Sequence, residues 1–158
     1  ARRARAGKPT IYRWWPNKFA LLLDIYQRYK ANLPIPDTGS LEGDLKQFLT
    51  GLFAFWQDSK AGTVFRSIVA QAQADPDAAA ALVAYERERM PQSGILIARA
   101  VARGTVAADA DPALIVEMLV SFAWHRLLTD RLADSEAAID TIVRIVAAGL
   151  AAQSANRP

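Results

Sequence analysis

The chain has 158 residues, no cysteine, one histidine and 52% hydrophobic residues. This size and apolar content suit one domain, or a small head on a larger body, and argue against a disordered chain. The absence of cysteine excludes disulfides, thiolate zinc sites and cysteine nucleophiles, and no apolar run approaches the roughly 18 residues of a membrane span, so we expect a cytoplasmic protein without a secretory signal.

The net charge of +3 is unevenly distributed along the chain. Residues 1–31 hold eight basic residues and one acid and carry +7, whereas residues 32–158 hold eleven basic and fifteen acidic residues and carry −4. A basic head on an acidic body indicates that the head meets polyanions. A merely solvated N-terminal tail is the alternative that composition leaves open.

The first part of the chain predicts two helices and a boundary. All periodic stretches have the helical period, so we expect an all-α protein. Residues 9–15 form a short helix that Pro16 ends, and Asn17 can cap a helix over 18–32. The expected apolar positions of that helix are Leu21, Leu22, Ile25 and Tyr29. The breaker-rich residues 33–39 then separate a head, residues 1–33, from a body, residues 40–153.

The body is expected to contain a bundle of five helices. Two of them follow strong start signals, Asp75-Pro76 and Asp111-Pro112, in which a capping residue precedes proline at the first helical position. Pro91 predicts a kink or break in the first of these, near Gly94. The five expected ranges are 41–57, 62–73, 76–103, 112–131 and 136–152.

The last two helices predict a partner subunit. The helix over 112–131 is apolar on nearly all sides and must be covered on both flanks. The helix over 136–152 has one apolar face and small alanines that permit close helix approach. A chain this short has few helices to spare for cover, so we expect a homodimer formed through 112–131 and 136–152.

Residues 8–22 read KPTIYRWWPNKFALL and form the most informative stretch. A short helix here would present hydrogen-bond donors and flat apolar groups, which suit phosphates, base edges and thymine methyl groups. A lysine at position 18 would lie at the start of the next helix, where it and the backbone amides favour a phosphate. The candidate DNA-binding residues are therefore Lys8, Pro9, Thr10, Tyr12, Arg13, Trp14 and Lys18.

This stretch resembles the recognition helix and the following helix of the TetR family of transcriptional regulators. Residues 40–45 and 99–106 look like the C-terminal domain of one common TetR subgroup. The resemblance implies a helix-turn-helix head on a ligand-binding and dimerisation body. It also implies that Thr10, Tyr12 and Lys18 contact phosphates and that Lys8, Pro9, Tyr12, Arg13 and Trp14 read the bases of a double-stranded DNA operator.

Two features depart from the family pattern. Residues 1–4 look like the end of the second head helix, and the resemblance implies that the first helix and part of the second are either disordered or absent. Arg5 stands where the tight turn usually has glycine, and it either strains the turn or adds a phosphate contact.

The body has more aromatic and methionine side chains than a small core needs, which suggests a ligand cavity among its first four helices. Taken singly, each of these residues favours a core position over a pocket position, and only the set as a whole suggests the cavity. We expect an apolar or amphipathic ligand, because no buried charge cluster is evident. The candidate ligand-binding residues are Phe55, Trp56, Phe65, Val69, Met90, Phe122 and Trp124.

These observations favour a ligand-responsive transcriptional regulator, most simply a repressor, over two other classes. An enzyme is disfavoured because no nucleophile–base pair or cofactor loop is present, and we expect no cofactor. The single His125, without a second histidine or a cysteine, makes a transition-metal site improbable. A helical interaction module would explain the body but not the basic head or the motif at 8–22.

Overall fold

The computed structural model describes residue 15 and residues 17–30, 33–58 and 60–155, with the backbone alone for 152–155. Within these ranges every regular element is a helix, which confirms the all-α prediction. The expected helix at 9–15 lies outside the described residues. The helices are α2 (Lys18–Lys30), α3 (Leu41–Asp58), α4 (Ala61–Ala72), α5 (Pro76–Ala102), α6 (Pro112–Leu128) and α7 (Glu136–Ala155).

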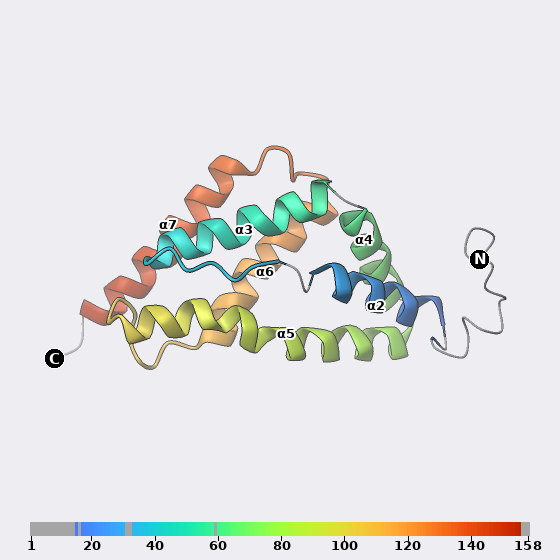
Figure 1. The fold of residues 1–158 in the computed structure, drawn as a ribbon, viewed down its shortest axis with the longest axis horizontal. Helices are drawn as coiled ribbons and strands as arrows, with labels where there is room; N and C mark the ends of the chain where they lie inside the picture. Colours follow the sequence, from blue (N-terminus) through green and yellow to red (C-terminus); the bar gives the residue numbers. More distant parts are fainter. Residues whose placement is uncertain (1–14, 16, 31–32, 59, 156–158) are drawn as a thin grey trace.

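The helices form a bundle in which α5 runs along one long edge and α3 and α7 lie on the opposite side, with α6 crossing between them (Figure 1). α4 packs against α2 and α5 at one end of the molecule, and α3 packs against α7. α2 is thus held against the bundle by α4, near one end of α5 (Figure 1).

Three helix starts follow the expected capping chemistry. Asn17 Oδ1 accepts a hydrogen bond from the backbone N–H of Ala20 at 2.8 Å. Asp75 accepts from the N–H of Asp77 at 2.9 Å, and Asp111 accepts from the N–H of Ala113 at 2.9 Å. These side chains satisfy amides that the helix itself leaves without partners, so the caps fix where α2, α5 and α6 begin.

Of the kink or break expected in the long helix near Gly94, the break is absent. α5 continues from Pro76 to Ala102 with Pro91 inside it. Gly94 is buried, and a Cβ atom there would lie 3.6 Å from Pro112 Cβ, so α5 packs closely on the start of α6. This packing holds the helix in one piece although proline removes one of its hydrogen bonds.

The buried face of α2 also differs from the expectation. Phe19, Leu23 and Tyr26 are buried, whereas Tyr29 is 62% exposed. The helix has large apolar residues on two sides, so periodicity alone did not decide between them. The choice follows from Tyr26, whose hydroxyl accepts a hydrogen bond from Trp56 Nε1 at 2.9 Å in the core.

The linker between α2 and α3 is tied to the body by the fully buried Asp44. Its carboxylate accepts hydrogen bonds from the N–H of Thr38 at 2.6 Å, from Thr38 Oγ1 at 2.8 Å and from Arg103 Nη2 at 3.2 Å. Burial opposes ionisation, but these hydrogen bonds outweigh it and lower the pKa of Asp44. Arg99 Nη1 donates to the carbonyl of Pro36 at 2.7 Å, so the end of α5 holds this linker.

Candidate functional site

A cavity of about 860 Å³ lies between α4, α5, α6 and the last residue of α2. Its size falls within the range of roughly 300–1,000 Å³ typical of small-molecule sites. α5 and α6 supply most of the wall, and the side chains there are largely apolar. The apolar wall residues include Phe65, Val83, Met90, Ile95, Val116, Val120 and Trp124.

One corner of this cavity is charged. Lys30, from the end of α2, and Glu86 and Arg89, from α5, are half-buried and line the cavity. Lys30 Nζ lies 6.0 Å from the ring centroid of Tyr26 and 5.7 Å from that of Tyr85. An ammonium group is attracted to aromatic ring faces at this range, so the two tyrosines hold the lysine in place.

The surroundings of this corner shift two ionisation equilibria. Burial, together with the nearby positive charge of Arg89, lowers the pKa of Lys30 to about 8, against the opposing effect of Glu86. Burial and the neighbouring Glu117 raise the pKa of Glu86. Both shifts follow from removing charges from water, and they mark the corner as the part of the cavity where charge is least well compensated.

Tyr85 contributes a hydroxyl group that lacks a partner. The residue lines the cavity and is 4% exposed, and its Oη makes no hydrogen bond within the described part of the chain. Burial raises its pKa, so the group remains a neutral phenol that can donate a proton. Buried polar groups are nearly always hydrogen-bonded, so this hydroxyl is a natural attachment point for a bound molecule.

The structure places three of the seven predicted ligand-binding residues in the wall of the cavity and four outside it. Phe65, Met90 and Trp124 line the cavity. The other four do not line the cavity but pack in or against the core. Trp56 donates a hydrogen bond to Tyr26, and the ring centroid of Phe55 lies 5.8 Å from that of Tyr26. Phe122 stacks on Phe53 with 6.1 Å between ring centroids, and Val69 packs against buried residues.

The sequence reading missed the polar corner. Tyr26 and Lys30 are one helical turn apart, and so are Tyr85 and Arg89. Residues four apart share a helix face. These two pairs are therefore the signal that could have found the corner, had the buried face of α2 been assigned correctly.

Of the predicted DNA-binding residues, Lys18 is described. It is exposed at the first position of α2. Beside it, Trp15 is half-buried, and its Nε1 donates to Asp24 Oδ2 at 3.1 Å. Lys8, Pro9, Thr10, Tyr12, Arg13 and Trp14 lie outside the described residues.

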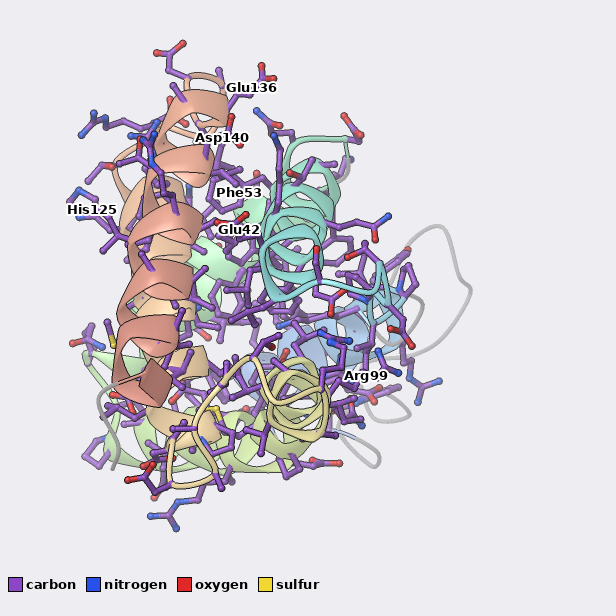
Figure 2. The ribbon with its side chains drawn as sticks, turned by 90° about the vertical axis from the view of Figure 1, so that its left-hand side faces the viewer. Glu42, Phe53, Arg99, His125, Glu136 and Asp140 are labelled. Carbon is purple, nitrogen blue, oxygen red and sulfur yellow. The ribbon has the colours of Figure 1, made fainter. Side chains whose placement is uncertain are left out.

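An apolar surface follows α6 and α7. Met118 of α6 is 54% exposed and Ile145 of α7 is 61% exposed. Leu114 and Leu128 are also exposed and, with Met118, follow one side of α6 at helical spacing. His125 points outward on the side of α7 that faces away from α3 (Figure 2).

The part of the chain that the structure describes contains neither a candidate metal site nor a candidate membrane span. No group of three or more histidine, cysteine, aspartate or glutamate side chains there could hold a metal ion. None of the described helices combines the length and apolar character needed to cross a membrane.

Comparison with known families and proteins gives consistent matches. Residues 35–146 match the family model described as the tetracyclin repressor-like C-terminal domain. The chain is 30% identical over 130 residues to the HTH-type transcriptional regulator YdeS of Bacillus subtilis (strain 168), covering 81% of this chain and 65% of that protein. It is 32% identical over 117 residues to the HTH-type transcriptional regulator AqdR of Rhodococcus erythropolis, covering 73% of this chain and 56% of that protein.

A solved structure agrees with these sequence matches. The crystal structure of the TetR family transcription regulator SCO0332 superposes with a TM-score of 0.73 at 26% sequence identity. The match covers 91% of this chain and 82% of that chain. The present chain thus spans 65% and 56% of the lengths of the two curated relatives and most of the solved one.

Proposed function

Because the chain belongs to the TetR family of HTH-type transcriptional regulators, which are not enzymes, we propose that it acts as a dimeric repressor controlled by a small amphipathic molecule. The observation that carries this proposal is the cavity, because it is bounded by the body helices and also by Lys30 at the end of α2. A molecule bound there touches the helix that directly follows the predicted recognition segment.

The DNA-binding part of the proposal rests on the basic head. Residues 1–31 carry +7, and the KPTIYRWW segment offers the donors that phosphates and base edges require. Lys18 supports this role, because it is exposed at the N-terminus of α2, where backbone amides and a lysine together favour a phosphate.

The dimer part of the proposal rests on α6 and α7. Their exposed apolar side chains would be covered by the same two helices of a second copy under two-fold symmetry. A dimer presents two recognition helices to half-sites about one helical turn of DNA apart, so their spacing decides operator affinity.

The regulatory part follows from linkage. A ligand changes operator affinity only through its different affinities for the DNA-competent and DNA-incompetent states. Tyr26 holds α2 in the core through Trp56, and Arg89 Nη2 lies 3.5 Å from the carbonyl oxygen of Lys30. A ligand that displaces these groups would shift α2, and a coupling of about 1–3 kcal/mol suffices for regulation.

A gel-shift titration of the full-length regulator against its own upstream DNA tests the proposal. We expect specific binding with a steep negative dependence on salt, because phosphate contacts release counterions. Lys18→Ala should weaken specific and non-specific binding alike and reduce the salt slope by about 1. Lys60→Ala, which changes an exposed lysine of the body, should leave both unchanged.

Two results of this titration would contradict the proposal. Binding that is insensitive to salt would contradict the assigned role of the head. Absence of any DNA binding would favour a helical interaction module in place of a DNA-binding regulator.

A further inference from the structure

Within the proposed function, on which this inference rests, the polar corner specifies the chemistry of the effector. We propose that the effector is an amphipathic anion, with an apolar body and a carboxylate headgroup, and that Lys30, Tyr85 and Arg89 bind the headgroup.

The ammonium group of Lys30 has no ion-pair partner among the described residues, because no carboxylate there lies within ion-pair distance of its Nζ. The group lies over the rings of Tyr26 and Tyr85, and Glu86 acts on it only from beyond that distance. A half-buried cation without an ion-pair partner has lost hydration without recovering the loss in an ion pair. An anionic oxygen in the cavity would supply the missing partner.

Tyr85 and Arg89 supply further hydrogen-bond donors to the same corner of the cavity. The Tyr85 hydroxyl is buried without a partner and is neutral, so it can donate to an oxygen that Lys30 holds. Arg89 lines the same corner, half-buried, and its contact to the Lys30 carbonyl, at 3.5 Å, is at the limit of a hydrogen bond. Hydrogen bonds in which one member is charged are about twice as strong as neutral ones, so three such donors favour a carboxylate over an alcohol.

Three carboxylates line the cavity opposite these cations. Asp111 and Glu117 are exposed, and Asp111 caps α6, whereas Glu86 is half-buried. The raised pKa of Glu86 reflects burial first and the charge of Glu117 second, so its ionised form is disfavoured. With Lys30 and Arg89 facing one half-buried carboxylate, the corner favours an added negative charge over a positive one.

The rest of the wall determines the body of the ligand. Met90, Val116, Val120 and Trp124 surround the space next to the polar corner with apolar surface. An alkyl or aromatic group bound there is removed from water, and this burial stabilises the complex. The headgroup therefore orients the molecule, and the apolar body provides most of the affinity.

A displacement experiment separates the headgroup from the body. The full chain is loaded with the uncharged fluorescent dye Nile red, and decanoate, decanol and decylammonium compete for the site at pH 7. The three competitors share one alkyl chain and differ in charge. We expect decanoate to displace the dye at the lowest concentration, about tenfold below decylammonium, as one charged hydrogen bond is worth.

Matched variants assign the effect to Lys30. Lys30→Met should weaken decanoate about tenfold while leaving decanol unchanged, and Lys30→Arg should restore most of the preference. Lys60→Met removes an exposed lysine elsewhere and should change nothing. Unchanged decanol displacement also shows that each variant retains the folded cavity.

Two other outcomes would overturn different statements. If decanol or decylammonium displaces the dye as well as decanoate does, the cavity exists but does not select an anion. If the dye does not bind, or binds equally to a Val120→Trp variant whose cavity is filled, the cavity is not an effector site and the proposed function fails with it.

Discussion

Lys30 is the last residue of α2 and lines the cavity. The protonation state of its ammonium group should therefore affect how the free energy of unfolding depends on pH. Its pKa is lowered to about 8 in the folded chain, from an ordinary value near 10.5, by burial and by Arg89. The charges acting on it are those of Glu86 and Arg89, and its ammonium group lies over the rings of Tyr26 and Tyr85. Glu117 of α6 lines the same cavity and acts on Glu86, and the wall residue from α4 is Phe65.

Between pH 8 and about 10.5 the unfolded chain holds the Lys30 proton and the folded chain has released it. The free energy of unfolding therefore rises with pH across this window. We expect the wild-type chain to gain stability relative to Lys30→Met over this range, as measured by urea unfolding at each pH. Tyr26 and Tyr85 are common to both chains, so their raised pKa values cancel in the difference. A difference that does not change with pH would contradict the burial of this ammonium group.

The sequence predicted individual residues best where local chemistry decides their role. Asn17, Asp75 and Asp111 were predicted as caps from their neighbours alone, and each caps a helix. Tyr85 and Lys30 were missed, because their importance arises from a cavity formed by residues distant in the chain. The residues next to a tyrosine in the sequence do not indicate whether its hydroxyl has a hydrogen-bond partner in the fold.

At the scale of elements, the Asp44 network positions the linker that joins α2 to α3. Asp44→Asn removes the charge that Arg103 and Thr38 hold and leaves Arg103 without this partner. We expect a loss of about 2 kcal/mol in the free energy of unfolding, since a buried hydrogen-bonded carboxylate is replaced by a neutral group. Urea unfolding measures the loss, and limited proteolysis should show faster cleavage within 33–40.

An exposed ion pair provides the control for this variant. Lys46 Nζ lies 2.6 Å from Asp140 Oδ1, where α3 meets α7, and both side chains are about half exposed. Asp140→Asn should reduce the free energy of unfolding much less than Asp44→Asn does, because solvent screens such a pair. Equal losses for the two variants would show that Asp44 does not hold the linker.

Helix positions could be predicted more readily than helix faces. The five body helices were expected close to their observed ranges, because start signals and apolar spacing are local. The face of α2 and the continuity of α5 depended on partners, namely Trp56 for Tyr26 and the start of α6 for Gly94. α6 ends at Leu128 rather than at residue 131, and Asp130 adopts a φ of 58° just beyond it. This reversal is a helix C-cap, in which the N–H of Asp130 donates to the carbonyl of Leu127 at 3.2 Å and the N–H of Arg131 donates to that of Arg126 at 2.8 Å.

At the scale of the whole molecule, the apolar surface of α6 and α7 should form the dimer. Phe122 of α6 and Val146 of α7 pack against the core, so charges there would disturb the fold. Met118 and Ile145 are exposed and test association without disturbing packing. Met118→Glu with Ile145→Glu should give a folded monomer in sedimentation, with helical content and unfolding cooperativity retained.

An obligate dimer buries above roughly 2,000 Å² in total, so side chains within its interface lose contact with water. Charged side chains introduced there are therefore expected to prevent association. Two like charges at its centre meet their symmetry copies, because a two-fold interface places each residue near the same patch of the partner. Tyr29→Glu, at an exposed position on α2, which packs against α4, is the matched control and should remain dimeric. Operator binding needs two heads at a fixed spacing, so the monomeric variant should also lose specific DNA binding. It should retain weak, salt-dependent binding through its single basic head. A stable monomer of the unmodified protein would contradict both the interface and the dimeric mode of regulation.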